Sequence, residues 1–203
     1  MNKLAAMVTL IIAVTAGCRG DIRPVTYYTL SSVQDTASGI LQLSGDEFSI
    51  GVGPIGFPDY LNRPYIASRD DSTKIVYSET HRWAGLLERD LAGVVAQDLS
   101  VILKTNRVRT YPWSGSFQPR YQVWLDVIRF DGRLREQARL NVIWRVLDHS
   151  QSGQPVVVRR SVITEPVGDE SSDDYDALVS AQSRALERMS REIADVIGKG
   201  PAQ

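Results

Sequence analysis

Several residue types are scarce in this chain of 203 residues, and each scarcity excludes a class of protein. Cysteine occurs once, so an intramolecular disulfide and a cysteine-based zinc cluster are both impossible. Histidine occurs twice, as His81 and His149, which leaves little for histidine-based catalysis or metal binding. The formal net charge is only -1, which excludes a broadly basic nucleic-acid binder. We therefore expect no nucleic-acid partner and no metal or other cofactor.

The N-terminal residues differ from the rest of the chain. Lys3 is the only charge in residues 1–17, and the apolar run from Leu4 to Val14 is too short to span a bilayer as a helix. Such a segment is typical of a signal peptide. Thr15-Ala16-Gly17-Cys18 then resembles a bacterial lipobox, although Thr15 stands where a leucine is usual. The interpretation is a lipoprotein acylated at Cys18; the alternative is an ordinary signal peptide with an incidental cysteine.

A short tether is expected to follow the acylated cysteine. Cys18 is followed by Arg19 rather than aspartate, a pattern that resembles lipoproteins sorted to the outer membrane in enteric-type bacteria. The polar residues Arg19 to Val25 reach at most about 25 Å when extended, so the folded body should lie close to its membrane. We expect a signal peptide over residues 1–17, a lipidated tether over 18–25 and a single domain over 26–198.

The remaining chain has the balance of a globular domain, with 43% hydrophobic and 23% charged residues. Alternating apolar residues predict strands over 26–30, 48–52, 74–78, 107–111, 121–130, 138–146 and 156–162. Three- and four-residue spacing predicts helices over 83–103 and from the acidic segment 169–176 to Gly198. The expected fold is α+β and two-layered, with a mostly antiparallel sheet and both amphipathic helices packed on one of its faces.

Two local signals refine this expectation. The Asp131-Gly132 dipeptide indicates a turn that ends the strand over 121–130. In that strand, Tyr121, Val123, Leu125 and Val127 are expected on one face, and Trp124, Ile128 and Phe130 on the other. Pro54, Pro58 and Pro64 exclude a helix, so residues 53–65 are expected to form a stiff, extended loop.

The sequence offers few candidates for chemistry. Gly51, Gly53 and Gly56 match a dinucleotide-binding pattern, but the prolines that follow block the helix that would bind the pyrophosphate. No nucleophile elbow is present, and the acidic segment 169–176 lacks the register of a calcium loop. Tyr121, Trp124, Phe130 and Trp144 could line a lipid groove, with cross-strand packing as the default. We therefore expect no catalytic residue and no metal ligand.

Six stretches, taken in order and spacing, resemble one family. They are Tyr27-Tyr28-Thr29-Leu30, Val52-Gly53-Pro54 through Pro58-Asp59-Tyr60-Leu61-Asn62-Arg63-Pro64, Arg82-Trp83-Ala84 with Leu86-Leu87, Tyr111-Pro112-Trp113, Phe130-Asp131-Gly132 followed by Trp144, and the helix from Leu178 to Ile197. The chain is similar to the PqiC family, the auxiliary lipoproteins of ABC-type transport systems that contain MCE-domain proteins. The resemblance covers essentially the whole chain after the lipobox.

The resemblance implies a non-enzymatic function. The protein would be a periplasmic lipoprotein on the outer membrane of a Gram-negative bacterium, anchored in the inner leaflet, and would dock an MCE-domain (PqiB-like) partner of a transenvelope lipid transport system that maintains membrane integrity. The resemblance is also compatible with a homo-oligomer. The alternative is a structural assembly factor, similar to a pilotin, for another outer-membrane machine.

The proline-rich loop is the candidate docking site. We expect Pro54 and Pro58 to stiffen it and Tyr60, Leu61 and Arg63 to be exposed for a partner, because a stiff loop loses little entropy on binding. The alternative is that Tyr60 and Leu61 only close the edge of the sheet.

Overall fold

The structure, a computed structural model, describes residues 24–33, 49–70, 73–151, 154–168 and 174–199. The expected signal peptide, Cys18 and most of the tether lie outside these residues. Within the described part of the chain, no helix is both long enough and apolar enough to cross a membrane.

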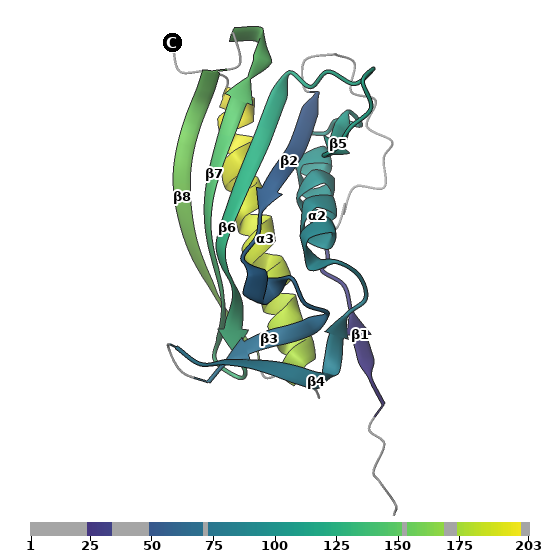
Figure 1. Cartoon of the computed structure of the whole chain (residues 1–203). Coiled ribbons are helices and arrows are strands. Elements are labelled where there is room, and N and C mark those ends of the chain that lie inside the picture. Colours follow the sequence, from purple (N-terminus) through teal and green to yellow (C-terminus); the bar gives the residue numbers. More distant parts are fainter. Residues whose placement is uncertain (1–23, 34–48, 71–72, 152–153, 169–173, 200–203) are drawn as a thin grey trace, which may run out of the picture.

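The described chain contains two long helices and two β-sheets (Figure 1). The helices are α2 (Leu87–Ile102) and α3 (Asp174–Lys199). The three-stranded sheet, in the order β1-β4-β3, consists of β1 (Thr26–Tyr28), β3 (Tyr65–Arg69) and β4 (Ile75–Trp83). The five-stranded sheet, in the order β5-β2-β6-β7-β8, consists of β2 (Ile50–Gly56), β5 (Val108–Thr110), β6 (Tyr121–Arg133), β7 (Gln137–Asp148) and β8 (Gln154–Pro166). Two single turns of 3-10 helix, η2 (Asp59–Leu61) and η3 (His149–Gln151), join strands.

The α+β class and the two helices are confirmed, but both sheets are mixed rather than mostly antiparallel. The expected antiparallel pairing is present between β6 and β7 and between β7 and β8. β2, however, pairs in parallel with both β5 and β6. The reason is the connection, since α2 carries the chain back along the sheet before β5 begins and such a crossover makes neighbouring strands parallel.

The core lies between the five-stranded sheet and the two helices. On β7, Ala138, Leu140, Val142, Trp144 and Val146 are fully buried and alternate with partly exposed residues, as expected for a strand with one buried face. On α3, buried residues recur at helical spacing and face this side of the sheet: Leu178, Ala181, Ala185, Met189 and Ile193. One apolar stripe per helix thus covers one face of the sheet.

Three local expectations are wrong. The helix expected from Trp83 begins only at Leu87, because Trp83 ends β4 and pairs with Tyr28 of β1. Phe130 is buried on the helix-facing side opposite Leu140, because a shift in register between Val127 and Arg129 reverses the alternation.

The turn expected at Asp131-Gly132 is also displaced. Both residues still belong to β6, and the chain reverses at residues 134–136, where Arg135 has a positive φ of 62°. A side chain at Gly132 would lie 2.5 Å from the carbonyl oxygen of Gln137 on β7. The glycine therefore serves close approach of two strands rather than a turn.

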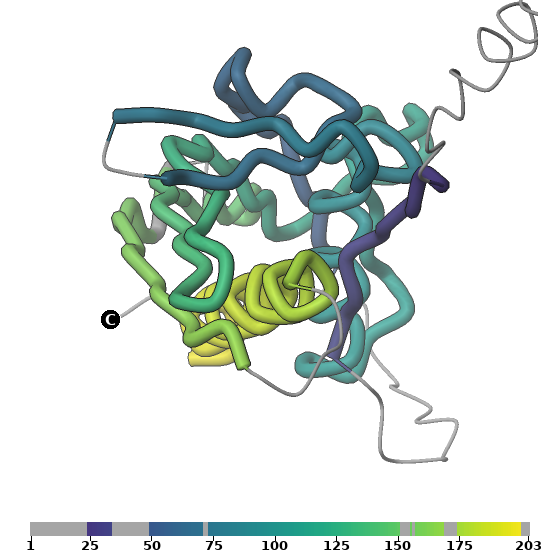
Figure 2. Tube along the Cα trace, turned by 90° about the horizontal axis from the view of Figure 1, so that it is seen from below, coloured from purple at the N-terminus to yellow at the C-terminus, as the bar shows by residue number. Residues whose placement is uncertain are grey.

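The small sheet lies across one end of the large one, as the view from below shows (Figure 2). We call this the hairpin end, and it comprises the β3–β4 hairpin, the β6–β7 turn at residues 134–136 and the first turn of α3. β1, the first described strand, begins at the same end. The described body therefore begins, at its N-terminal side, at the hairpin end.

Candidate partner-docking site

The loop between β2 and β3 is folded more tightly than a stiff, extended loop. Residues 59–61 form η2, which Pro58 precedes in an extended conformation. Asp59, Asn62 and Arg63 are exposed, while Pro54 in β2 and Pro58 are partly buried. The expected exposure of Leu61 is wrong, since only 4% of it is exposed and it joins the hydrophobic core. The expected exposure of Tyr60 is wrong as well, because its ring is partly buried and packs against that core.

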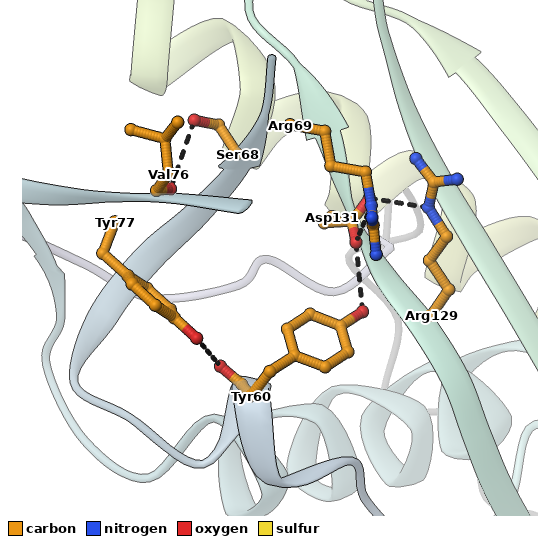
Figure 3. A network of polar contacts seen from close by, with 7 residues as sticks. All are labelled: Tyr60, Ser68, Arg69, Val76, Tyr77, Arg129 and Asp131. Carbon is orange, nitrogen blue, oxygen red and sulfur yellow. Dashed lines mark hydrogen bonds and ion pairs between the residues drawn. The ribbon is translucent and has the colours of Figure 1, made fainter. Parts of the chain in front are cut away.

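Tyr60 is directed toward a buried carboxylate on β6. Its hydroxyl donates a hydrogen bond to Asp131 Oδ2 at 3.0 Å. Arg69 Nε from β3 donates to the same oxygen at 2.8 Å, and Arg129 Nε donates to Asp131 Oδ1 at 2.7 Å (Figure 3). The side chain of Asp131 is 0% exposed. We call these four residues the Asp131 clamp.

The clamp joins three segments that are distant in sequence. Asp131 and Arg129 belong to the large sheet, Arg69 to the small sheet and Tyr60 to η2. Tyr77 of β4 adds a further link, since its hydroxyl donates to the backbone oxygen of Tyr60 at 3.0 Å. A buried carboxylate needs such charge-assisted donors to offset its loss of water. The small sheet is therefore fixed against β6 by polar contacts as well as by packing.

The ionisation of the clamp follows from its geometry. Burial raises the pKa of the Tyr60 hydroxyl to about 12, and the negative charge of Asp131 contributes to this rise. Burial alone would lower the pKa of Arg69, but the hydrogen bond to Asp131, the negative charge of Asp131 and the contact with Tyr60 together outweigh burial and raise that pKa. At neutral pH, Tyr60 is thus a neutral donor and Arg69 a cation. Neither Tyr60 nor Arg69 is therefore poised to exchange a proton near pH 7.

Arginine side chains lie over the aromatic rings next to the clamp. The guanidinium of Arg63 lies 5.4 Å from the ring centre of Tyr77. That of Arg82 lies 5.0 Å from the ring centre of Tyr65. Stacking of this kind restricts a long side chain while leaving its charge available. Asp59, Asn62 and Arg63 therefore form a polar surface that rests on a rigid support, and we call them the η2 surface.

Two of the three glycines of the dinucleotide-like pattern have a packing explanation in residues 111–119. A side chain at Gly51 would lie 2.7 Å from the Trp113 ring, and one at Gly53 would lie 2.7 Å from Tyr111 Cβ. Gly53 also has a φ of +117°, which only glycine adopts easily. The strand then leads into a single 3-10 turn rather than a helix. The pattern thus allows residues 111–119 to pack closely on β2, and it builds no phosphate site.

The other candidate residues are dispersed. His81 Nδ1 lies 2.9 Å from Ser78 Oγ, and its ring stacks on Tyr175 at 4.2 Å between ring centres. His149 is exposed at the far end of β7. A lipid groove lined by the four aromatic residues is wrong, because Tyr121, Phe130 and Trp144 are buried on the helix-facing side and Trp124 lies on the opposite face. Among the described residues, no group of three or more potential metal ligands comes together.

Two buried carboxylates that link distant segments, Asp131 and Asp98, were not predicted from the sequence. Asp131 resembles a turn residue because glycine follows it, and only the long strand around it hints otherwise. Asp98 lies on the apolar face of α2 and is 0% exposed; it accepts hydrogen bonds from the Val33 backbone N–H at 2.8 Å and from Ser190 Oγ at 2.9 Å. A charged residue at a core position of a helix was the available signal.

Comparison with known proteins identifies a sequence family and similar solved structures. The sequence model of the family described as ABC-type transport auxiliary lipoprotein component matches residues 28–194. The crystal structure of an uncharacterised protein is similar with a TM-score of 0.68 and 18% identity, covering 85% of this chain and 98% of the other. A crystal structure of a protein from Xanthomonas campestris is similar with a TM-score of 0.66 and 19% identity, covering 86% of this chain and 97% of the other. At such identities these structures show a shared fold. No curated protein sequence matches the chain.

Proposed function

We propose that this chain, which belongs to the family of ABC-type transport auxiliary lipoprotein components, is the outer-membrane-anchored subunit of an MCE-type transenvelope lipid transport system. The family match over residues 28–194 carries the proposal, because it covers nearly all of the chain that follows the expected lipobox. The family is one of transport components rather than a known enzyme family. The role that we assign is accordingly docking and not catalysis.

The anchor gives the body its position. With Cys18 acylated, each buried methylene of the acyl chains would contribute about 0.8 kcal/mol to membrane attachment. The folded body begins with β1 at Thr26, so the tether is too short to hold it more than about 25 Å from the bilayer. The hairpin end would therefore lie toward the inner leaflet of the outer membrane, and the rest of the body would extend into the periplasm.

The η2 surface is our proposed contact for the MCE-domain partner. Leu61 and Tyr60 lie beneath it and support it, rather than touching the partner themselves. Because Tyr60 is fixed by Asp131 and Tyr77, the surface loses little conformational entropy on binding. Arg63 supplies an exposed cation that an acidic or carbonyl-rich partner surface would recognise.

Capture of partners from the native envelope tests this proposal. The tagged, full-length protein is expressed in its own host, cross-linked and purified from detergent-solubilised envelopes, and the captured proteins are identified by mass spectrometry. We expect an MCE-domain protein. Arg63→Ala should reduce its recovery several-fold while changing the melting temperature little, because an exposed cation–π contact stabilises a fold by about 0.5–1 kcal/mol. Arg191→Ala, which removes an exposed arginine of α3 that pairs with Glu187, is the matched control.

Each contrary outcome has a definite meaning. Recovery of a secretin or β-barrel protein instead of an MCE-domain protein would favour the assembly-factor alternative. A loss of thermal stability in Arg63→Ala with unchanged recovery would mean that the loop is only structural. Cys18→Ser should move the protein from the outer-membrane fraction to the soluble periplasm; retention in that fraction would refute the lipid anchor.

A further inference from the structure

A cleft opens at the hairpin end between the two sheets. It measures about 280 Å³ and lies between the β3–β4 hairpin, the β6–β7 turn and the first turn of α3. Its lining consists of Ser68, Arg69, Asp70, Val76, Arg133, Leu134, Glu136 and Tyr175. Pockets for whole drug-sized ligands are generally larger. The cleft is therefore suited to a small polar group or to one end of a longer molecule.

The charges around the cleft are balanced. Arg69 and Arg133 contribute two cations, and Asp70 and Glu136 contribute two carboxylates. Arg69 is paired with the buried Asp131, whereas Asp70 is paired at 3.2 Å with Lys74 in an exposed pair that a ligand can replace. Arg133 pairs with Glu136 at 3.2 Å, and both side chains are more than a third exposed, so this pair is weak and a ligand can replace it. A ligand of a single charge would meet repulsion as well as attraction here. A ligand that carries both a phosphate and an ammonium group would satisfy both pairs of charges.

The cleft also has an apolar wall. Val76 is 39% exposed, and the partly buried Leu134 and Tyr175 also line the cleft. Such a wall suits the glycerol and first methylene groups of a lipid better than it suits a free, fully polar headgroup. The combination of a balanced polar mouth and an apolar wall matches the boundary between the headgroup and the acyl chains of a phospholipid.

Arg69 has a fixed position in this arrangement. Its Nε is bound to Asp131 at 2.8 Å, so the Asp131 clamp holds the guanidinium at the inner side of the cleft. The elements that line the cleft belong to the hairpin end, where β1 also begins (Figure 1). This is the end that the proposed lipid anchor would bring to the bilayer. The cleft thus lies at the end of the body that the proposed anchor would bring to the membrane, where a lipid headgroup could reach it.

We propose that this cleft binds the headgroup region of a zwitterionic phospholipid of the phosphatidylethanolamine type, with the phosphate at Arg69 and Arg133 and the ammonium at Asp70 and Glu136. The proposal rests on the proposed lipid anchor only for the source of the lipid, and it requires no transport partner.

Solution NMR with soluble short-chain lipids tests the site directly. The mature chain from residue 18, carrying Cys18→Ser so that no acyl group competes, is titrated with dihexanoyl-phosphatidylethanolamine below its micelle concentration. Parallel titrations use dihexanoyl-phosphatidylglycerol and free phosphoethanolamine. We expect saturable amide shifts confined to residues 68–70, 76, 133–136 and 175. Arg133→Ala should weaken the binding about tenfold through the loss of a charge-assisted hydrogen bond.

Arg135→Ala is the matched control, because Arg135 belongs to the same turn but pairs with Asp174 and does not line the cleft. Unchanged binding in this variant, together with weaker binding in Arg133→Ala, supports the site. Equal binding of the phosphatidylglycerol lipid would overturn the zwitterion assignment, and equal binding of free phosphoethanolamine would overturn the lipid assignment. Shifts outside the cleft, or equal effects of both variants, would overturn the site itself. None of these results depends on whether an MCE-domain protein is captured.

Discussion

Replacing Asp131 with asparagine isolates the charge of the clamp from its shape. Asparagine occupies nearly the same volume and keeps one oxygen that can accept a hydrogen bond from Tyr60 or from an arginine. It lacks the negative charge that faces Arg69 and Arg129 at 2.8 and 2.7 Å. Its amide nitrogen is a hydrogen-bond donor and would face the N–H or O–H donors that now bind Asp131. The substitution therefore leaves two guanidinium groups beside a buried position without their counter-charge.

The expected cost follows from burial. Removing one partner of a fully buried ion pair costs about 3–5 kcal/mol. Here the side chain of Asp131 is 0% exposed, but those of Arg69 and Arg129 are 14% and 26% exposed, so water compensates part of the loss. We expect Asp131→Asn to lower the free energy of unfolding by about 2–3 kcal/mol. For a chain of this size, such a change lowers the melting temperature by about 5–10 °C.

Urea unfolding at pH 7, followed by circular dichroism, measures this free energy by linear extrapolation. The matched control is Asp126→Asn on the same strand. Asp126 pairs with Arg145 at 2.8 Å, but these side chains are 49% and 37% exposed. An exposed pair of this kind contributes about 0–1 kcal/mol. If Asp131→Asn costs no more than Asp126→Asn, the small sheet is held by apolar packing and the reasoning about the clamp is wrong.

Two further predictions concern single backbone and core positions. Gly53→Ala should lower the free energy of unfolding by about 1–3 kcal/mol, because the residue has a φ of +117° and its new Cβ would touch Tyr111. Gly93→Ala, in the exposed interior of α2, should instead raise the free energy of unfolding by about 0.5–1 kcal/mol. Urea unfolding of both variants measures this difference. Burial raises the pKa of Asp98 above its ordinary value, so the folded protein takes up this proton before the unfolded chain does, and the contribution of Asp98 to stability increases as the pH falls through the folded-state pKa. The asparagine of Asp98→Asn cannot take up a proton. The free energy of unfolding of the wild-type protein minus that of Asp98→Asn should therefore increase as the pH is lowered from 7 to 4. A constant or decreasing difference would contradict the role of burial.

Elements whose stability depends on a local pattern could be predicted from the sequence. The apolar stripe of α3 and the alternation of β7 each repeat over several turns or residue pairs, and the structure buries the residues that this repetition selects. Both elements pack on the same core with one face. The fold class follows from counting such faces, because each helix stripe needs a sheet face to cover it.

Features that depend on contacts between distant segments could not be predicted. The pairing of β2 with β5 and β6 depends on the path of the chain through α2, which leaves no mark on β2 itself. The reversed face of Phe130 depends on one extra residue in β6, whose alternation is otherwise regular. Asp131 is bound by Tyr60 and Arg69, which precede it in sequence by 71 and 62 residues. No window of local sequence contains all three residues.

The same clamp connects the two proposed binding regions. Asp131 binds Tyr60, which supports the η2 surface, and it binds Arg69, which lines the cleft at the hairpin end. A ligand that binds Arg69 thus acts on a carboxylate that also holds η2, and a partner on η2 acts on the same carboxylate from the other side. Coupling between sites requires such a shared element, and it must be reciprocal. If the two sites are coupled, Asp131→Asn will remove the influence of the lipid on partner binding even where each site still binds alone; Asp126→Asn, outside the clamp, will preserve it.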